Sequence, residues 1–170
     1  PPLCDGPREI SSSGIREAIE EGNVDLAARW LERPFTLIGR VATGAGRGRT
    51  IGIPTANLEP ENEFIPRGGV YAGYARLMGS TAENKRTQPW PAVINIGRAP
   101  TFEREREIKI EAHLLGFAGD LVGHPLALSF VYHLRPERRF ASPEELIAQI
   151  QEDIARATER LGIDASSQRR

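Results

Sequence analysis

The stretch from residue 35 to residue 134 predicts six strands in succession with no helix between them. Apolar and polar residues alternate there with a period of about two, the spacing of a strand that buries one face. The predicted strands cover residues 36–42, 51–57, 70–78, 92–96, 109–115 and 126–134. Parallel strands would need long crossover connections, so these strands should pair antiparallel. We therefore expect a mainly β fold in which the sheet closes into a barrel and leaves no free edge.

Helical patterns flank this β region on both sides. On the C-terminal side, Ser142-Pro143-Glu144-Glu145 is a capping box with proline at the first helical position. It predicts one long helix, and the apolar stripe of that helix contains Leu146, Ile147, Ile150, Ile154, Ala157 and Leu161. On the N-terminal side, the apolar spacing predicts two short helices. The serines at 11–13 are candidate N-caps of the first, and Asn23 is a candidate N-cap of the second.

Charge, cysteine usage and missing motifs narrow the functional classes. The net charge of −1 argues against a general nucleic-acid or membrane-surface binder. A single cysteine, Cys4, excludes an internal disulfide and is compatible with a reducing compartment. No apolar run reaches the roughly 18 residues of a membrane span, and there is no P-loop, GxSxG motif or zinc-ligand spacing. We expect one cytoplasmic domain with neither a nucleic-acid nor a membrane partner.

Residues 44–57, with the sequence GAGRGRTIGIPTAN, are the first candidate for a functional site. Four glycines in this stretch allow backbone N–H groups to approach an anion closely. Pro54 favours an extended conformation around it, and on an extended segment Thr55 and Asn57 point the same way. A hydroxyl and an amide oxygen side by side suit Mg²⁺ that takes its other ligands from phosphate and water. The alternative is a glycine-rich hairpin loop followed by an ordinary edge strand.

Glu111 is the second candidate. It lies in a predicted strand between Ile110 and Ala112, on the face that it shares with Lys109 and His113. Phosphoryl transfer needs a group that accepts the alcohol proton, and a rigid strand beside a phosphate-binding loop can place one. The alternative is a solvent-exposed glutamate, and the histidines at 113 and 133 are expected to be ordinary polar residues on strand faces. From the residues alone, both phosphotransfer and simple binding of a phosphate ligand stay open.

The order of short motifs resembles the riboflavin kinase (flavokinase) domain of bacterial bifunctional riboflavin kinase/FMN adenylyltransferases. The matching segments are GRGRTIGIPTANL at 46–58, GGVYAG at 68–73, NIGRAPTF at 95–102, IEAHLLGFAGDLVG at 110–123 and LRPERRFASPEELIAQIQEDIARA at 134–157. They extend over nearly all of residues 35–161. The resemblance implies a six-stranded antiparallel Greek-key barrel with a long C-terminal helix, and here two short N-terminal helices precede it.

The resemblance also assigns roles to individual residues. It implies that Thr55 and Asn57 bind Mg²⁺ together with the ATP phosphates and that Glu111 is the base for the riboflavin 5′-hydroxyl. Residues 44–52 would form a mobile flap over the phosphates, and residues 115–123 would border the adenine. The expected ATP-binding residues in these two loops are Gly44, Gly46, Arg47, Gly48, Arg49, Gly52, Leu115, Phe117 and Leu121. Arg135 and Phe140 are expected on the flavin side, together with Glu111.

One residue departs from the usual pattern of the family, and one N-terminal segment resembles a second domain of the bifunctional enzymes. Val122 stands where the family usually has tyrosine, which removes an aromatic ring near the expected adenine position. Residues 10–16, ISSSGIR, resemble the motif that ends the adenylyltransferase domain of the bifunctional enzymes, although the HxGH motif of that domain is absent. We therefore expect residues 1–33 to be the tail of a missing domain of a longer bifunctional chain, 34–162 to be the kinase unit and 163–170 to be disordered.

The expected activity is the ATP-dependent phosphorylation of riboflavin to FMN and ADP, with Mg²⁺ bound to ATP. A chain without the adenylyltransferase motif should not make FAD. The main alternative is a flavin-binding barrel without catalytic activity, which would need neither ATP nor a metal pair. A barrel that binds single-stranded nucleic acid is disfavoured by the net charge and by the absence of an aromatic and basic strand face.

Overall fold

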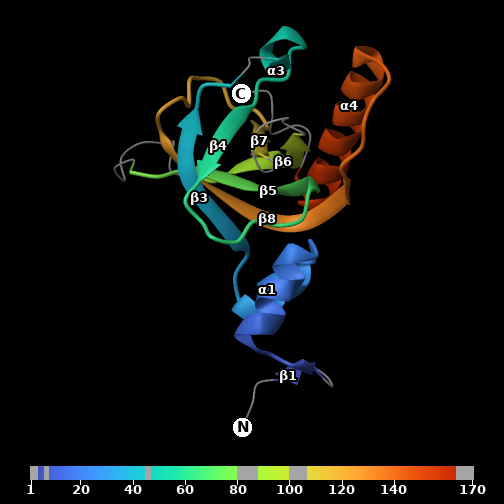
Figure 1. The fold of residues 1–170 in the computed structure, drawn as a ribbon. Helices are drawn as coiled ribbons and strands as arrows, with labels where there is room; N and C mark the ends of the chain where they lie inside the picture. The colour runs from blue at the N-terminus through green and yellow to red at the C-terminus, as the bar shows by residue number, and fades with distance from the viewer. Residues whose placement is uncertain (1–3, 6–7, 45–46, 80–87, 100–106, 164–170) are drawn as a thin grey trace.

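Six strands form the closed antiparallel barrel that the sequence predicts (Figure 1). The computed structural model describes residues 4–5, 8–44, 47–79, 88–99 and 107–163. The strands of the barrel are β3 (Phe35–Ala42), β4 (Ala56–Pro60), β5 (Gly69–Leu77), β6 (Trp90–Ala99), β7 (Glu107–Leu114) and β8 (Pro125–Pro136). They are hydrogen-bonded in the order β3-β4-β7-β6-β5-β8. Because β8 returns to lie beside β5 after the β5-β6-β7 meander, the connection is a Greek key.

The barrel is filled by the apolar residues of the alternating pattern. Its interior contains Leu37, Val41, Leu58, Tyr71, Ile94, Ile96, Ile110, Ala112, Leu126, Leu128 and Phe130, all buried. Tyr71 meets Phe130 edge-on, with ring centroids 5.2 Å apart. Burial raises the pKa of the Tyr71 phenol to about 12, and its hydroxyl donates to the Arg67 carbonyl at 2.5 Å. The core thus extends to the loop before β5.

The second strand begins later than the sequence predicts. Instead of extending from residue 51, the chain forms a short helix, α3 (Arg47–Thr50), and then a turn in which the Ile53 N–H donates to the Gly48 carbonyl at 2.7 Å. Gly52 has a φ of +76° in this turn, a conformation that glycine adopts without strain. Since Pro54 has no N–H for a ladder, pairing starts only at Ala56. The prediction of a strand over 51–55 was wrong because the turn and Pro54 together delay the start of pairing.

The alternation predicted for residues 126–134 is also broken. The register between β5 and β8 shifts where Gly73 lies opposite Phe130 and Ala72 lies opposite Tyr132, which leaves Val131 as an extra residue. A bulge of this kind reverses which side chains face inward. Tyr132 and Leu134 therefore join an outer apolar cluster instead of the barrel interior. His133 turns inward, and its ring centroid lies 4.9 Å from that of Tyr71.

His133 should make the stability of the barrel depend on pH. Its buried Nε2 has no hydrogen-bond partner among the described residues, and burial lowers the pKa of the imidazole below 6.5, while a backbone contact with Arg135 opposes this. The unfolded chain then binds the proton more readily than the folded chain. We expect the contribution of the neutral His133 imidazole to the free energy of unfolding to be complete above pH 6.5. It should decrease as the pH falls from 6.5 through the lowered pKa.

Urea unfolding followed by circular dichroism at a series of pH values measures this dependence. In the variant His133→Phe, which keeps an aromatic ring but has no proton to bind, the decrease below pH 6.5 should be smaller. An unchanged slope in the variant would show that other groups cause the decrease.

The N-terminal helices are α1 (Ser12–Glu20) and α2 (Val24–Leu31). The predicted serine cap is confirmed, since Ser11 Oγ accepts from the Gly14 N–H at 3.1 Å. Asn23 occupies the N-cap position of α2, but its side-chain amide donates to the Glu21 carboxylate and does not cap the helix. Before α1, the two short strands β1 (Cys4–Asp5) and β2 (Arg8–Glu9) pair with each other. Figure 1 shows α1 and α3 at opposite ends of the barrel.

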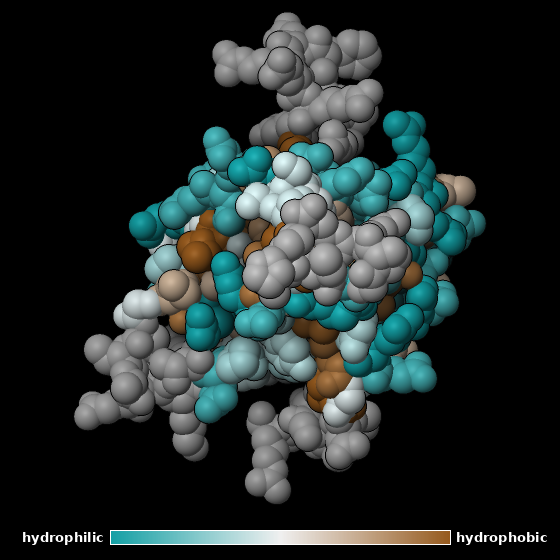
Figure 2. Space-filling model, turned by 90° about the horizontal axis from the view of Figure 1, so that it is seen from below, coloured by the Kyte–Doolittle hydropathy of each residue, from teal (hydrophilic) through white to brown (hydrophobic). Residues whose placement is uncertain are grey.

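The long helix α4 (Pro143–Arg160) packs on the outside of the barrel. Its N-cap is Ser142, whose side chain accepts from the Glu145 N–H, as the capping box predicts. Its buried Ala157 forms an outer apolar cluster with Val70, Ala72, Val93 and Leu134 of the barrel. Seen from the end that carries α1, the surface is mostly hydrophilic, and its apolar side chains show as separate areas (Figure 2). No helix formed by the described residues is long and apolar enough to cross a membrane.

Candidate active site

Three strands bring a carboxylate between two side-chain amides. In the β4-β7 ladder Asn57 lies opposite Glu111, and in the β7-β6 ladder Glu111 lies opposite Asn95. Residues that are directly opposite each other in a sheet point to the same face. Because the sequence neighbours Ile110 and Ala112 fill the barrel interior, this row faces outward. Although the row faces outward, all three side chains are half-buried, so they lie on rigid strands and are still accessible from outside.

Asn95 is the member of this row that sequence reasoning missed. The signal was present in the alternation, because Asn95 lies between the buried residues Ile94 and Ile96 and is therefore directed away from the core. What the alternation does not reveal is that β6 pairs with β7 in the register that places Asn95 opposite Glu111.

The glycine-rich loop packs directly on Thr55 and Asn57. A methyl group at Gly44 would overlap the Asn57 side-chain amide, and one at Gly48 would come within 3.2 Å of the Thr55 hydroxyl oxygen. The absence of side chains at these two glycines therefore lets the loop approach the predicted metal ligands. Gly52 has open space around it. Gly46 and the side chains of Arg47 and Arg49, also predicted to bind ATP, lie outside the described residues.

Thr55 and Asn57 fit a divalent ion that is held mainly by its nucleotide. They offer one hydroxyl and one amide oxygen, which are ligands of the kind that Mg²⁺ accepts. Within the described part of the chain, no group of three or more His, Cys, Asp or Glu side chains is placed to hold a metal. An ion at this position would thus need oxygen atoms from phosphate and water, as Mg²⁺ bound to ATP does.

The residues predicted for the adenine side lie in the loop between β7 and β8. Leu115 is buried, and Phe117 packs edge-on against Trp90 with ring centroids 5.3 Å apart. Leu121 packs against the barrel core, whereas Val122 is 43% exposed. The structure therefore gives the three predicted residues a packing role, and their contact with a nucleotide stays a prediction.

Arg135 and Phe140, predicted on the flavin side, lie beside α4. The Arg135 side chain donates to both carboxylate oxygens of Asp153, at 2.7 to 3.1 Å, and to the Pro136 carbonyl at 3.1 Å. Phe140 lies under two guanidinium groups, 4.7 Å from that of Arg138 and 5.8 Å from that of Arg135. All three guanidinium nitrogens of Arg135 are thus used within the fold. A flavin contact of Arg135 or Phe140 stays a prediction.

Near Asn95, the Glu137 carboxylate lies close to two glycines. A methyl group at Gly97 would come within 3.0 Å of the Glu137 carboxylate, and one at Gly68 would come within 3.6 Å of it.

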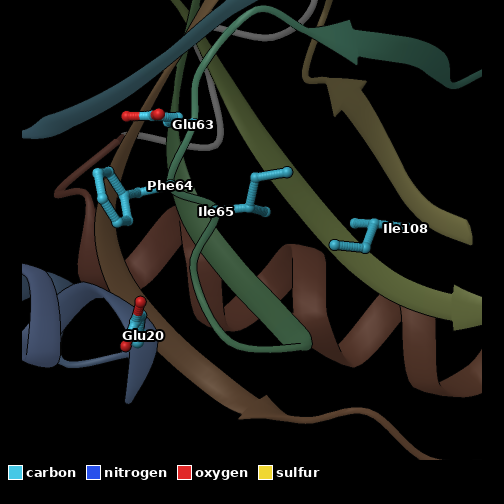
Figure 3. A pocket seen from close by; sticks show the side chains of 5 residues that line it. All are labelled: Glu20, Glu63, Phe64, Ile65 and Ile108. Atoms are coloured by element: carbon cyan, nitrogen blue, oxygen red, sulfur yellow. The ribbon is translucent and has the colours of Figure 1, made fainter. Parts of the chain in front are cut away.

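Two separate hollows lie elsewhere on the described surface. One, of about 450 Å³, lies between α1 and the loop after β4 and is lined by Glu20, Glu63, Phe64, Ile65 and Ile108 (Figure 3). The other, of about 440 Å³, lies along α1 and α2. The predicted site residues line neither hollow.

Comparison with known proteins assigns the chain to a family. Residues 31–161 match the sequence model of the riboflavin kinase (flavokinase) family. The chain belongs to the riboflavin kinase family. It is 41% identical over 153 residues to the bifunctional riboflavin kinase/FMN adenylyltransferase of Pseudomonas fluorescens, which covers 90% of this chain and 46% of the relative. It is 40% identical over 161 residues to that of Escherichia coli K12, which covers 95% of this chain and 49% of the relative. This riboflavin kinase family member thus spans about half the length of these curated relatives.

Two solved structures resemble this member of the riboflavin kinase family. One is described as a macrolide-efflux protein from Streptococcus pneumoniae, with a TM-score of 0.82 and 32% identity, covering 91% of this chain and 48% of that one. The other is a riboflavin kinase from Trypanosoma brucei, with a TM-score of 0.52 and 22% identity, covering 76% of this chain and 80% of that one. The second likeness concerns the fold alone.

Proposed function

We propose that this chain transfers the γ-phosphoryl group of Mg-ATP to the 5′-hydroxyl of riboflavin and releases FMN and ADP. The observation that carries the proposal is the strand register that places Glu111 between Asn57 and Asn95, next to a loop whose glycines contact Thr55 and Asn57. In a chain of the riboflavin kinase family, this arrangement would place a proton acceptor, the Glu111 carboxylate, beside a loop that can bind the ATP phosphates.

Each group has a distinct task in the proposed reaction. Thr55 and Asn57 would hold Mg²⁺, which neutralises charge on the phosphate oxygens when it is bound. Glu111 accepts the proton of the 5′-hydroxyl as that oxygen attacks the γ-phosphorus. Among the described residues no ion pair engages the Glu111 carboxylate, and its two cross-strand neighbours are neutral amides. Closure of the loop at 44–52 would exclude water and limit hydrolysis of ATP.

Incubation with riboflavin and Mg-ATP, followed by chromatographic separation of the flavins and nucleotides, tests this function. We expect FMN and ADP in equal amounts. Flavin binding without FMN formation would instead identify the barrel as a non-catalytic flavin-binding module. Formation of FAD would contradict the view that residues 1–33 are a remnant without adenylyltransferase activity.

We also propose that the kinase unit works in the cytoplasm as part of a longer bifunctional chain. The support comes from the relatives, which are named as bifunctional enzymes and are about twice as long as this chain. In this proposal residues 1–33 belong to the second domain and residues 34–162 form the kinase unit. The tail predicted at 163–170 lies, except for Ile163, outside the described residues.

Removal of either proposed metal ligand should weaken the use of Mg-ATP. In Thr55→Ala and Asn57→Ala, the Mg²⁺ concentration for half-maximal rate should rise about tenfold or more, because even the loss of a residue that only supports a metal ligand costs about 10–100-fold. Initial rates measured over a range of Mg²⁺ concentrations show the effect. Asn23→Ala, which removes an exposed amide far from the site, serves as the control. An unchanged Mg²⁺ dependence in both variants would remove the metal assignment.

A further inference from the structure

The segment between the glycine-rich loop and β4 is held by a side chain of β7. The β4-β7 ladder ends at the pair Ala56 and Ala112, so residues 54 and 55 lie beyond it. The Pro54 carbonyl lies 2.8 Å from Nδ1 of His113. Because a carbonyl only accepts hydrogen bonds, Nδ1 must carry the proton, and both the neutral Nδ1–H form and the imidazolium provide it.

His113 also lies on the same face of the same strand as Glu111. The two residues are two positions apart, which places them about 7 Å from each other along β7. One rigid strand therefore carries the proposed base and the donor that holds Pro54, the residue directly before Thr55. Sequence reasoning expected an ordinary polar residue at 113. The structure shows a side chain with a specific backbone partner 59 positions away.

The need for such a donor follows from the loop. The turn of the loop closes on itself through the hydrogen bond from Ile53 to Gly48, and Thr55 is exposed directly after it. If the loop at 44–52 closes over the phosphates as proposed above, Thr55 would move with it unless another contact held the segment. The hydrogen bond from His113 to the Pro54 carbonyl is such a contact.

We propose that His113 is a positioning residue that holds Thr55 in the place required for Mg-nucleotide binding, an inference that rests on the proposed kinase function. It acts on the nucleotide through Pro54 and Thr55 and has no direct role in proton transfer. Its loss should therefore weaken the binding of the metal–nucleotide complex more than the binding of riboflavin.

Three variants distinguish the effect of the hydrogen bond from His113 to Pro54 from the effect of side-chain packing at position 113. His113→Leu removes the donor. His113→Asn can present its amide N–H near the position of Nδ1, whereas the amide of His113→Gln reaches the position of Nε2. Affinity for Mn²⁺ bound to ADP, measured by electron paramagnetic resonance without turnover, is the main measurement. Kinetic constants for Mg-ATP and riboflavin, riboflavin fluorescence quenching and thermal unfolding accompany it.

We expect the dissociation constant of Mn-ADP and the KM for Mg-ATP to rise about 10–100-fold in His113→Leu, the usual cost of losing a residue that supports a metal ligand. Riboflavin binding should stay unchanged, and His113→Asn should recover most of the affinity while His113→Gln does not. If His113→Leu does not fold, the comparison of the Asn and Gln variants still shows whether a donor at the position of Nδ1 is needed for nucleotide binding.

The inference is overturned if His113→Leu binds Mn-ADP as the wild type does, or if the Asn variant is as weak as the Gln variant. It is also overturned if riboflavin binding falls by the same factor as nucleotide binding. Failure of the proposed function is a separate result: the wild-type protein would then form no FMN, whatever the variants bind.

Discussion

Replacement of Glu111 by Gln is expected to lower the turnover number about 10²–10⁴-fold, the usual contribution of a positioned general base. The amide has the size and shape of the carboxylate but does not accept the proton of the 5′-hydroxyl. Because the side chain is only half-buried and lies outside the barrel core, the fold should be retained. The rate of FMN formation at saturating riboflavin and Mg-ATP measures the effect, and riboflavin fluorescence quenching checks that substrate still binds.

The matched control is Glu59→Gln. Glu59 is an exposed glutamate on β4, two residues beyond Asn57, and it has no part in the proposed chemistry. This variant should turn over at close to the wild-type rate. If Glu111→Gln also retained a near-complete rate, Glu111 would not be the base, and the polar row would serve to bind substrate only.

Replacement of Asp153 by Ala is expected to reduce the free energy of unfolding by about 3–5 kcal/mol, the cost of removing one partner of a buried ion pair. The side chains of Arg135 and Asp153 are only 14% and 3% exposed, and their closest nitrogen and oxygen atoms are 2.7 Å apart. The variant would leave the guanidinium of Arg135 between β8 and α4 without its carboxylate. Urea unfolding followed by circular dichroism at neutral pH measures the loss.

A paired replacement separates the charge from the packing. Because a buried ion pair can be exchanged for apolar residues of similar volume at little cost, Arg135→Met combined with Asp153→Leu should be much more stable than Asp153→Ala. A loss below about 1 kcal/mol in Asp153→Ala, the value typical of a surface pair, would contradict a structural role for this contact. The paired variant also tests the predicted flavin contact of Arg135, because unchanged riboflavin affinity would remove that assignment.

Several features of the fold were predictable because they depend on neighbours in the sequence. The alternation around Glu111 correctly placed its side chain outside the barrel, since successive residues of a strand point to opposite faces. The capping box at Ser142 correctly marked the start of the long helix, since its hydrogen bonds span only three or four residues. The expected succession of six strands was confirmed for the same reason, with errors at their ends.

The errors arose where the pattern of one segment was changed by another. The bulge beside Val131 follows from the register between β5 and β8, and it reversed the expected positions of Tyr132 and His133. The late start of β4 follows from the turn between Gly48 and Ile53, which the glycine content suggested only as a loop. Neither feature can be read from hydrophobic periodicity within a single strand.

By itself, the sequence determined the class of fold, the outward direction of Glu111 and, through the order of its motifs, the family. Only the tertiary structure decided that Asn57, Glu111 and Asn95 lie in one row, that Arg135 pairs with Asp153 and that His113 reaches Pro54. The physical reason is the range of the interactions. Periodicity and capping depend on residues a few positions apart, whereas these contacts depend on strand order and register, which are set when distant segments pack into one barrel.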